Sequence, residues 1–135
     1  MLVARPLGSS NKATAICAST DNIGDFVYVN GGKVGAKYSV TKVDVTQRAT
    51  MPAIAVITGK LNSTECVIQF QGEVPNIYTG LTPGKLYFVG VDGRPSPTSP
   101  VAGPGAKAYS QVVGLAVDAA ILKLEVITDL KVRVG

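Results

Sequence analysis

The chain has 135 residues, of which 46% are hydrophobic and 16% are charged. This length suits one domain with a substantial core, and a second domain is not expected. Because the sequence contains no histidine, chemistry that needs an imidazole as a base or a metal ligand is excluded. The net charge is +4, but the 13 Lys and Arg residues are dispersed along the chain. That dispersion favours an ordinary solvated surface over a nucleic-acid footprint.

The first ten residues, MLVARPLGSS, lack the apolar run of a signal peptide, and no segment is apolar for long enough to span a membrane. Cys17 and Cys66 lie within apolar strings, which favours two buried free thiols in a reducing compartment over a disulfide. Asn62 begins an Asn-Ser-Thr triplet that we interpret as a polar turn rather than a glycosylation site.

Valine-rich segments separated by Gly and Pro predict an all-β fold of short strands. The predicted strands are residues 26–29, 37–45, 53–57, 65–71, 86–91, 109–117 and 121–127.

Two of these strands have informative periodicity. In 65–71, the residues Cys66, Ile68 and Phe70 alternate with polar residues that include Gln69, which predicts one core face and one mostly solvated face. In 37–45, the apolar residues start at Tyr38 and Val40 and then shift to Val43 and Val45. That change of phase predicts a β-bulge near residues 41–42.

The segment 117–124, VDAAILKL, is the one place where a helix competes with a strand. We predict a hairpin with Asp118 and Ala119 in its turn and with Leu122, Leu124 and Val126 on one face. A short helical turn at Asp118 is the alternative.

GDFVYV at 24–29 is echoed sixty positions later by GKLYFV at 84–89. Either the chain contains two pseudo-repeated halves or valine-rich strands resemble each other by chance. The predicted fold is therefore a single small β-barrel or sandwich, built from two pseudo-repeated halves if the echo is a true repeat, with extended terminal arms. The predicted boundaries are an N-terminal arm at 1–12, the β-domain at 13–127, and a C-terminal arm or edge strand at 128–135.

No residues in the sequence form a recognisable catalytic set. Without histidine, nucleophilic catalysis needs a Ser–Lys or Cys–acid pair, and no spacing places one. The carboxylates lie mostly beside Gly, Asn or strand ends, where turn formation accounts for them. The glycines in VAGPG at 101–105 lack both a Lys-Ser/Thr pair and a following helix, so a phosphate site is unsupported. We predict a non-enzymatic protein with no cofactor, no metal and no small-molecule substrate.

The segment LYFVGV at 86–91 is apolar on both faces, so a second sheet or another subunit is expected to cover it. The prolines of RPSPTSP, which cannot donate to a ladder, are expected to end strand pairing at that edge. The terminal segments suggest arms that pair with a neighbour, although an edge strand within the same domain is equally expected for the C-terminus. The predicted partner-contact residues are Leu2, Val3, Arg5, Leu7, Tyr87, Val89, Arg94, Pro95, Pro97, Pro100, Leu130 and Val132.

The order of GDFVYV, AIAVI, ECVIQFQGEV, GLTPGKLYFVGVDGRPSP and QVVGLAVDAAILKLEV resembles a β-rich module of tailed-bacteriophage structural proteins. Similar modules occur in small head-decoration (cement) proteins and in pieces of tail fibres and baseplates. The resemblance covers about residues 22–127 and is carried by turn glycines and core apolar positions, so it transfers no functional residue. It implies a virion component, frequently trimeric, without catalytic residues.

The resemblance leads to the expectation of a capsid decoration protein on the outer surface of a phage head, made in the host cytoplasm. Its partners would be the major capsid protein and itself, as a homo-oligomer with a trimer expected, and no membrane. The absence of a long repetitive shaft favours this location over the alternative of a tail-fibre or baseplate module. The other alternative is a single-stranded nucleic-acid-binding barrel with Tyr28 and Tyr87 as stacking platforms, which the dispersed cations disfavour.

Overall fold

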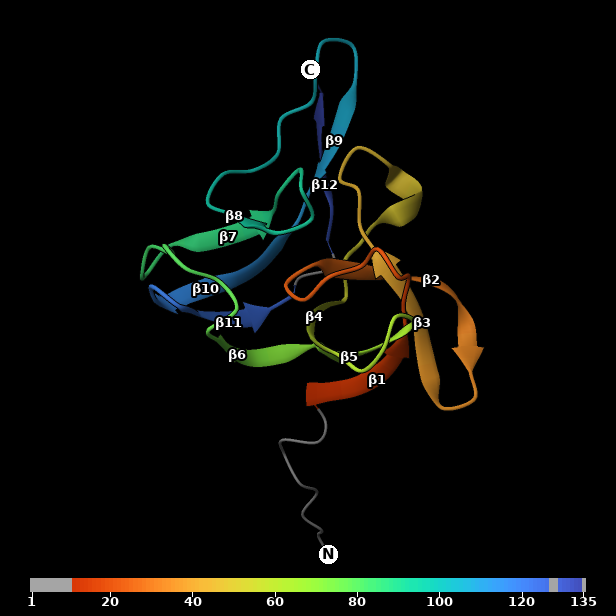
Figure 1. Ribbon diagram of the computed structural model, residues 1–135. Coiled ribbons are helices and arrows are strands. Elements are labelled where there is room, and N and C mark those ends of the chain that lie inside the picture. The colour runs from red at the N-terminus through yellow and green to blue at the C-terminus, as the bar shows by residue number, and fades with distance from the viewer. Residues whose placement is uncertain (1–10, 127–128, 135) are drawn as a thin grey trace, which may run out of the picture.

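The computed structural model describes residues 11–126 and 129–134, and in that part of the chain the fold is all-β (Figure 1). A short 3₁₀ segment, η2 (Arg48–Thr50), lies between the third and fourth strands. The strands are β1 (Lys12–Ile16), β2 (Phe26–Val34), β3 (Lys37–Lys42), β4 (Ala55–Lys60), β5 (Glu65–Gln69), β6 (Gln71–Pro75), β7 (Leu86–Val89), β8 (Pro95–Ser96), β9 (Lys107–Ser110), β10 (Val112–Asp118), β11 (Ile121–Glu125) and β12 (Lys131–Val134).

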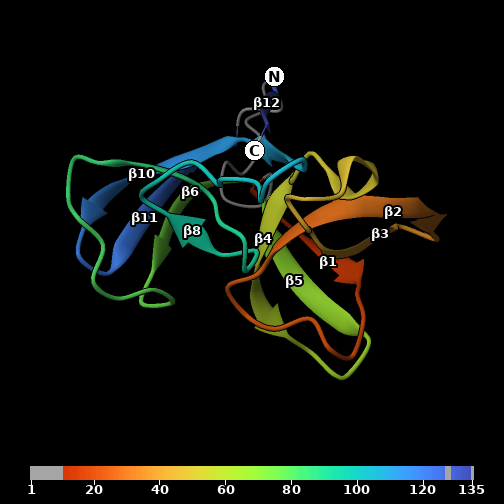
Figure 2. The same cartoon turned by 90° about the horizontal axis from the view of Figure 1, so that it is seen from above.

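The first half of the chain closes into a barrel with the strand order β1-β3-β2-β4-β5. β1 runs parallel to β3, and the other neighbouring strands are antiparallel. Figure 2 shows this barrel beside the sheet formed by the second half of the chain. The prediction of a small β-barrel or sandwich is confirmed, with the barrel formed by the first half of the chain. Its interior is filled by Ala15, Cys17, Val27, Val40, Ala55, Ile57, Cys66 and Ile68.

The second half forms an open sheet with the order β6-β11-β10-β7-β8, which packs against the outside of the barrel. β2 and β4 contribute side chains to both the barrel interior and the core between the layers, because successive side chains of a strand point to opposite faces. Phe26 and Val56 lie in the core between the layers, whereas Val27 and Ile57 lie inside the barrel. The two halves are thus joined by shared strands.

The apolar strand at 86–91 is covered on one face only. Tyr87 and Val89 are buried in the core between barrel and sheet. On the other face Phe88 is half-buried and Leu86 is 51% exposed, and beyond the end of β7 Val91 is 70% exposed. The layer that covers this strand is therefore the barrel of the same chain, and not another subunit.

The predicted strand 65–71 is divided between the two layers, because β5 ends at Gln69 in the barrel and β6 begins at Gln71 in the sheet. Cys66 and Ile68 are buried as predicted. The prediction that Gln69 is solvated is wrong, because only 4% of it is exposed. Its amide nitrogen donates to the main-chain oxygens of Gln71 and Glu73 at 2.9 and 3.0 Å, which satisfies the buried group.

The prediction of a bulge at residues 41–42 is also wrong. β3 ends at Lys42, and its pairing with β2 is irregular on the β2 side, between Val29 and Val34. Val40 points into the barrel, whereas Val43 and Val45 follow the strand and enter the core between the layers. The apolar phase changes because the chain passes from the barrel interior to the core between the layers.

The β10–β11 hairpin is confirmed in place of a helical turn, with its turn at 119–120, one residue later than expected. Leu122 and Leu124 are buried as predicted. The echo of 24–29 in 84–89 is local: Gly24 and Gly84 both have positive φ, 96° and 84°, shortly before a strand. The strands themselves then enter different architectures, a closed barrel and an open sheet.

Candidate interaction site

The predicted contact residues of the N-terminal arm, Leu2, Val3, Arg5 and Leu7, lie outside the described residues. Two others, Tyr87 and Val89, were wrongly predicted: they are 3% and 0% exposed, because the barrel packs over their face of β7. The Tyr87 hydroxyl accepts a hydrogen bond from the Thr82 N–H at 2.8 Å. The burial of Tyr87 also removes it as a stacking platform for nucleic acid.

Arg94 holds the two layers of the molecule together. Its guanidinium donates to the Ile23 main-chain oxygen at 2.6 Å, and its Nε lies 3.6 Å from Oδ1 of Asp25, which is buried. The guanidinium occupies the space beside Gly24, where a Cβ would lie 2.7 Å from an Arg94 nitrogen. Arg94 is thus committed to an internal contact between the barrel and the β7–β8 turn.

Tyr78 strengthens the same junction. Its hydroxyl donates to the Gly24 main-chain oxygen at 2.7 Å, and its ring lies in the core between the layers. Burial raises the pKa of Tyr78 well above its ordinary value, and the nearby Arg94 opposes this rise only in part. The phenol therefore stays protonated and keeps its hydrogen bond at neutral pH.

The proline-rich segment borders the open sheet as predicted. Pro95 and Ser96 form the two-residue strand β8, which pairs with β7 at the edge of the sheet. Pro97 is exposed, whereas Pro100 is buried. The chain then folds back, and the Ser99 hydroxyl donates to the Ser110 hydroxyl at 2.7 Å.

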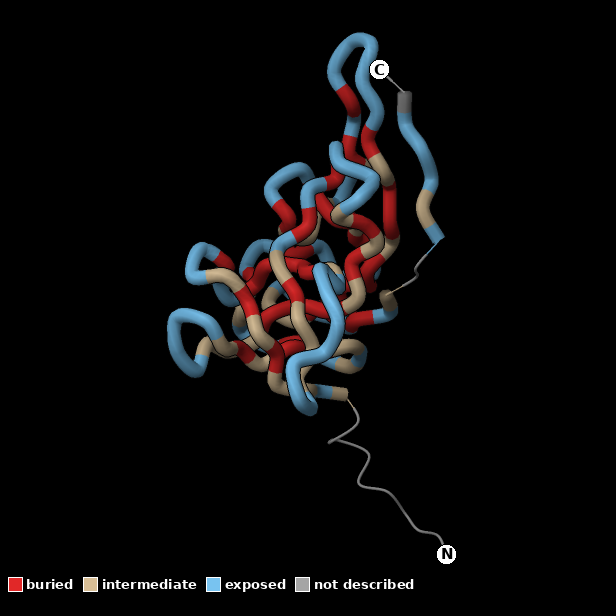
Figure 3. Tube along the Cα trace, turned by 90° about the vertical axis from the view of Figure 1, so that its right-hand side faces the viewer, coloured by how far each residue is buried: buried red, intermediate tan, exposed pale blue. Residues whose placement is uncertain are grey.

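β9 and β12 form a separate two-stranded ribbon, which Figures 1 and 3 show rising from the body of the molecule. The C-terminal segment is thus an edge strand within the same chain, which was one of its two predicted roles. Leu130, just before β12, packs against the core, whereas Val132 is 53% exposed. Of the predicted contact residues, Val132 is the one most available to a partner on this ribbon.

The ribbon also brings together cations that lie far apart in the sequence. Lys107 on β9 and Lys131 and Arg133 on β12 are all exposed. These cations look dispersed along the chain because no local pattern indicates that β9 and β12 are neighbours. The outer end of the molecule is therefore more basic than its linear charge distribution indicates.

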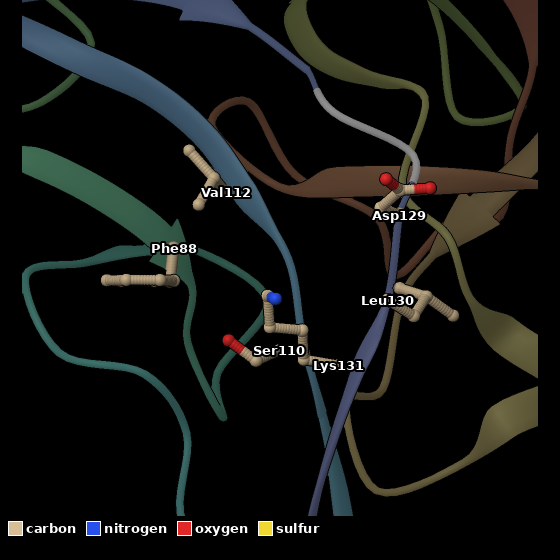
Figure 4. Close-up of a pocket in the computed structure, with 6 residues that line it drawn as sticks. All are labelled: Phe88, Ser110, Val112, Asp129, Leu130 and Lys131. Atoms are coloured by element: carbon tan, nitrogen blue, oxygen red, sulfur yellow. The ribbon is translucent and has the colours of Figure 1, made fainter.

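A cavity of about 360 Å³ lies beside β12. Figure 4 shows that its lining comes from β7, from the β9–β10 region and from the segment leading into β12. The mixture of aromatic, aliphatic and charged side chains resembles a small binding pocket in size and character. Sequence reasoning missed this pocket, because its walls meet only through long-range pairing. The lining residues are Phe88, Ser110, Val112, Asp129, Leu130 and Lys131.

The two cysteines are buried free thiols in the barrel, as predicted. Burial raises the pKa of the Cys66 thiol, and neighbouring Cys17 raises it further. Lys60 Nζ lies 3.6 Å from Cys17 Sγ and donates to the main-chain oxygens of Ala18 and Asp21. These contacts anchor the loop that follows β1. The raised pKa keeps the Cys66 thiol protonated near neutral pH.

Within residues 11–126 and 129–134, no three His, Cys, Asp or Glu side chains are grouped so that they could hold a metal ion. In the same part of the chain, no helix has the length and apolar character needed to cross a membrane.

Comparison of the chain with protein-family models, with curated proteins and with solved structures gave no match.

Proposed function

We propose that this protein is a non-enzymatic structural component of a bacteriophage particle, which decorates the head by binding the major capsid protein. The observation that carries the proposal is the projecting β9–β12 ribbon, with exposed Val132, three cations and a pocket at its base. In the body of the molecule, Arg94 and Tyr78 make contacts between the layers, whereas the ribbon has an exposed edge strand, β12. The resemblance of residues 22–127 to phage head-decoration modules supports the same reading.

The proposed mechanism is reinforcement of contacts between capsid subunits. Each 1,000 Å² of apolar surface buried on docking contributes roughly 25 kcal/mol before entropic losses. Many copies of a small clamp would then resist pressure from inside the capsid. The N-terminal arm and self-association, with a trimer expected, would add contacts to those of the ribbon.

The proposal is tested by adding purified protein to capsids that lack it and measuring co-sedimentation. We expect saturable addition at a fixed ratio to the capsid protein, and decorated capsids that withstand a higher temperature. Val132→Glu should weaken addition, because it places a carboxylate on the exposed ribbon. Leu61→Glu is the matched control, since Leu61 is another exposed apolar residue, 58% accessible, far from the ribbon in sequence.

The outcome that contradicts the proposal is a protein that fails to add to undecorated capsids at any concentration. In the tail-fibre or baseplate alternative, the ribbon is still the binding element, but the protein is located in the tail of the particle. Immunogold labelling of intact particles distinguishes the two, because label on the head supports decoration and label confined to the tail supports the alternative.

A further inference from the structure

The free edges of the sheets differ in how well they could accept another strand. At the β6 edge, the Gln69 amide occupies the carbonyls of Gln71 and Glu73. At the opposite edge of that sheet, β8 is only Pro95–Ser96. The outer part of β2 carries two register shifts, which twist an edge away from regular pairing. By contrast, β12 pairs with β9 in continuous register and contains neither proline nor glycine.

The direction of the β12 backbone groups follows from one hydrogen bond of β9. Tyr109 lies opposite Val132, and its N–H donates to the Val45 oxygen at 2.8 Å, on the side of β9 away from β12. Tyr109 and Val132 therefore form a non-hydrogen-bonded pair, in which both residues direct their N–H and C=O away from each other. The Val132 N–H and C=O consequently point to the outer edge of β12. Within the described residues, no hydrogen bond occupies them.

An added strand on this edge would pair with the main chain of Val132. Main-chain hydrogen bonds of this kind are how extended peptides are recognised at free sheet edges. The 360 Å³ cavity takes no part in this contact, because Phe88, Ser110 and Val112 line it from β7, β9 and β10, on the other side of β12.

The charges on β12 indicate which strand fits. If a second copy paired antiparallel about Val132, Lys131 of each copy would lie opposite Arg133 of the other, and like charges directly opposite are destabilising. A strand with carboxylates at those positions would instead be attracted, and Lys107 on β9 adds to the positive charge.

We propose that the outer edge of β12 binds an extended segment of a different protein, with carboxylates at alternate positions. This deepens the proposed function and rests on it, since it identifies the kind of capsid segment that the ribbon would receive. Main-chain bonds to Val132 supply affinity, and the cations Lys131 and Arg133 supply selectivity.

The test is selection of a random displayed peptide library on the purified full-length protein, followed by fluorescence anisotropy of the enriched peptides. We expect sequences with alternating Asp or Glu, whose replacement by Asn or Gln weakens binding. Val132→Pro removes the outward N–H without removing a β9–β12 ladder bond, so it should fold and bind about tenfold more weakly. Val132→Thr keeps that N–H and is the matched control, with wild-type affinity expected.

A charge reversal tests the identity of the partner. With Lys131→Glu and Arg133→Glu combined, the original peptides should lose binding at least about tenfold, and a repeated selection should enrich basic residues. The circular dichroism spectra and melting temperatures of all variants establish that the fold persists.

Four results would overturn the inference: enriched peptides without carboxylates, equal binding by Val132→Pro, oligothymidine that displaces the peptides in a salt-sensitive way, or self-association abolished by Val132→Pro. Addition of the Val132→Pro variant to capsids at wild-type strength would remove this inference and leave the proposed function intact. If the peptides bind but the wild-type protein does not add to capsids, the inference stands and the proposed function is contradicted.

Discussion

Gln111 joins the sheet to the barrel through a single buried amide. Its Oε1 accepts from the Ala53 N–H and its Nε2 donates to the Ala53 oxygen, both at 2.8 Å. Only 1% of Gln111 is exposed, and Ala53 is fully buried. Because both residues are buried, removing the amide would leave two main-chain groups unsatisfied.

Gln111→Leu should lower the free energy of unfolding by roughly 2–4 kcal/mol, because it keeps the volume but leaves the Ala53 N–H and C=O without partners. Urea unfolding monitored by circular dichroism measures the change. Gln47→Leu is the control, since Gln47 is exposed and its side chain makes no hydrogen bond in the described structure. A loss for Gln111→Leu no larger than for the control would show that the amide clamp is unimportant.

Two buried groups predict a loss of stability at alkaline pH. Burial raises the pKa of both Tyr78 and Cys66 in the folded protein, above ordinary values of about 10 and 8.5. Their stabilising effect is complete below the ordinary values and is lost as pH rises above them, because the unfolded chain releases these protons first. Unfolding free energies at neutral and strongly alkaline pH should therefore differ.

A double variant isolates this effect from the titration of other residues. Tyr78→Phe with Cys66→Ala should be less stable at neutral pH, since the hydrogen bond to Gly24 is lost. Its stability should nevertheless fall less steeply with rising pH than that of the wild type. Parallel curves for the two proteins would be inconsistent with raised pKa values.

At the scale of the elements, Gly114 allows β10 to lie close to its neighbours. A Cβ at this position would lie 2.6 Å from the Lys123 main-chain oxygen and 3.2 Å from Leu122 carbons. Gly114→Ala should therefore lower the free energy of unfolding by about 1–3 kcal/mol, because the β10–β11 pair must separate. Gly103→Ala is the matched control, with no atom within 4 Å of its added Cβ. Equal unfolding midpoints for both variants would contradict the close approach.

Local periodicity was enough to predict several elements. The alternation of Cys66 and Ile68, the β10–β11 hairpin and the proline-bordered edge all depend on neighbouring residues, and all are confirmed. The burial of Gln69 and of Tyr87 could not be predicted from local periodicity. Both depend on which distant segment lies above the residue, and that is decided by the closure of the barrel.

The interaction site was equally hard to predict for a physical reason. Val132 was among the predicted contact residues, but the pocket that Lys131 lines needs β7, β10 and the start of β12 to meet. The positive charge of the ribbon needs Lys107 to lie on the neighbouring strand of Arg133. Neither the pocket nor the clustering of cations can be predicted from a local sequence pattern.

At the scale of the whole molecule, the shared strands predict a single cooperative unit. Phe26 and Val27 are adjacent residues of β2, yet one belongs to the core between the layers and the other to the barrel interior. Separating the layers would expose Phe26 and break the bonds of Arg94 and Tyr78. Calorimetry should show one transition with equal calorimetric and van't Hoff enthalpies. Two resolved transitions would mean that the barrel and the sheet unfold independently.

The central claim is that the protein is a structural part of a phage particle, and the most direct measurement is its copy number in purified particles. Quantitative mass spectrometry against isotope-labelled peptides of this chain and of the major capsid protein provides that number. The decoration hypothesis predicts copies on the order of the capsid subunits themselves, in a fixed ratio across preparations. Particles that lack the chain, purified from infected cells that contain it in abundance, would contradict the claim.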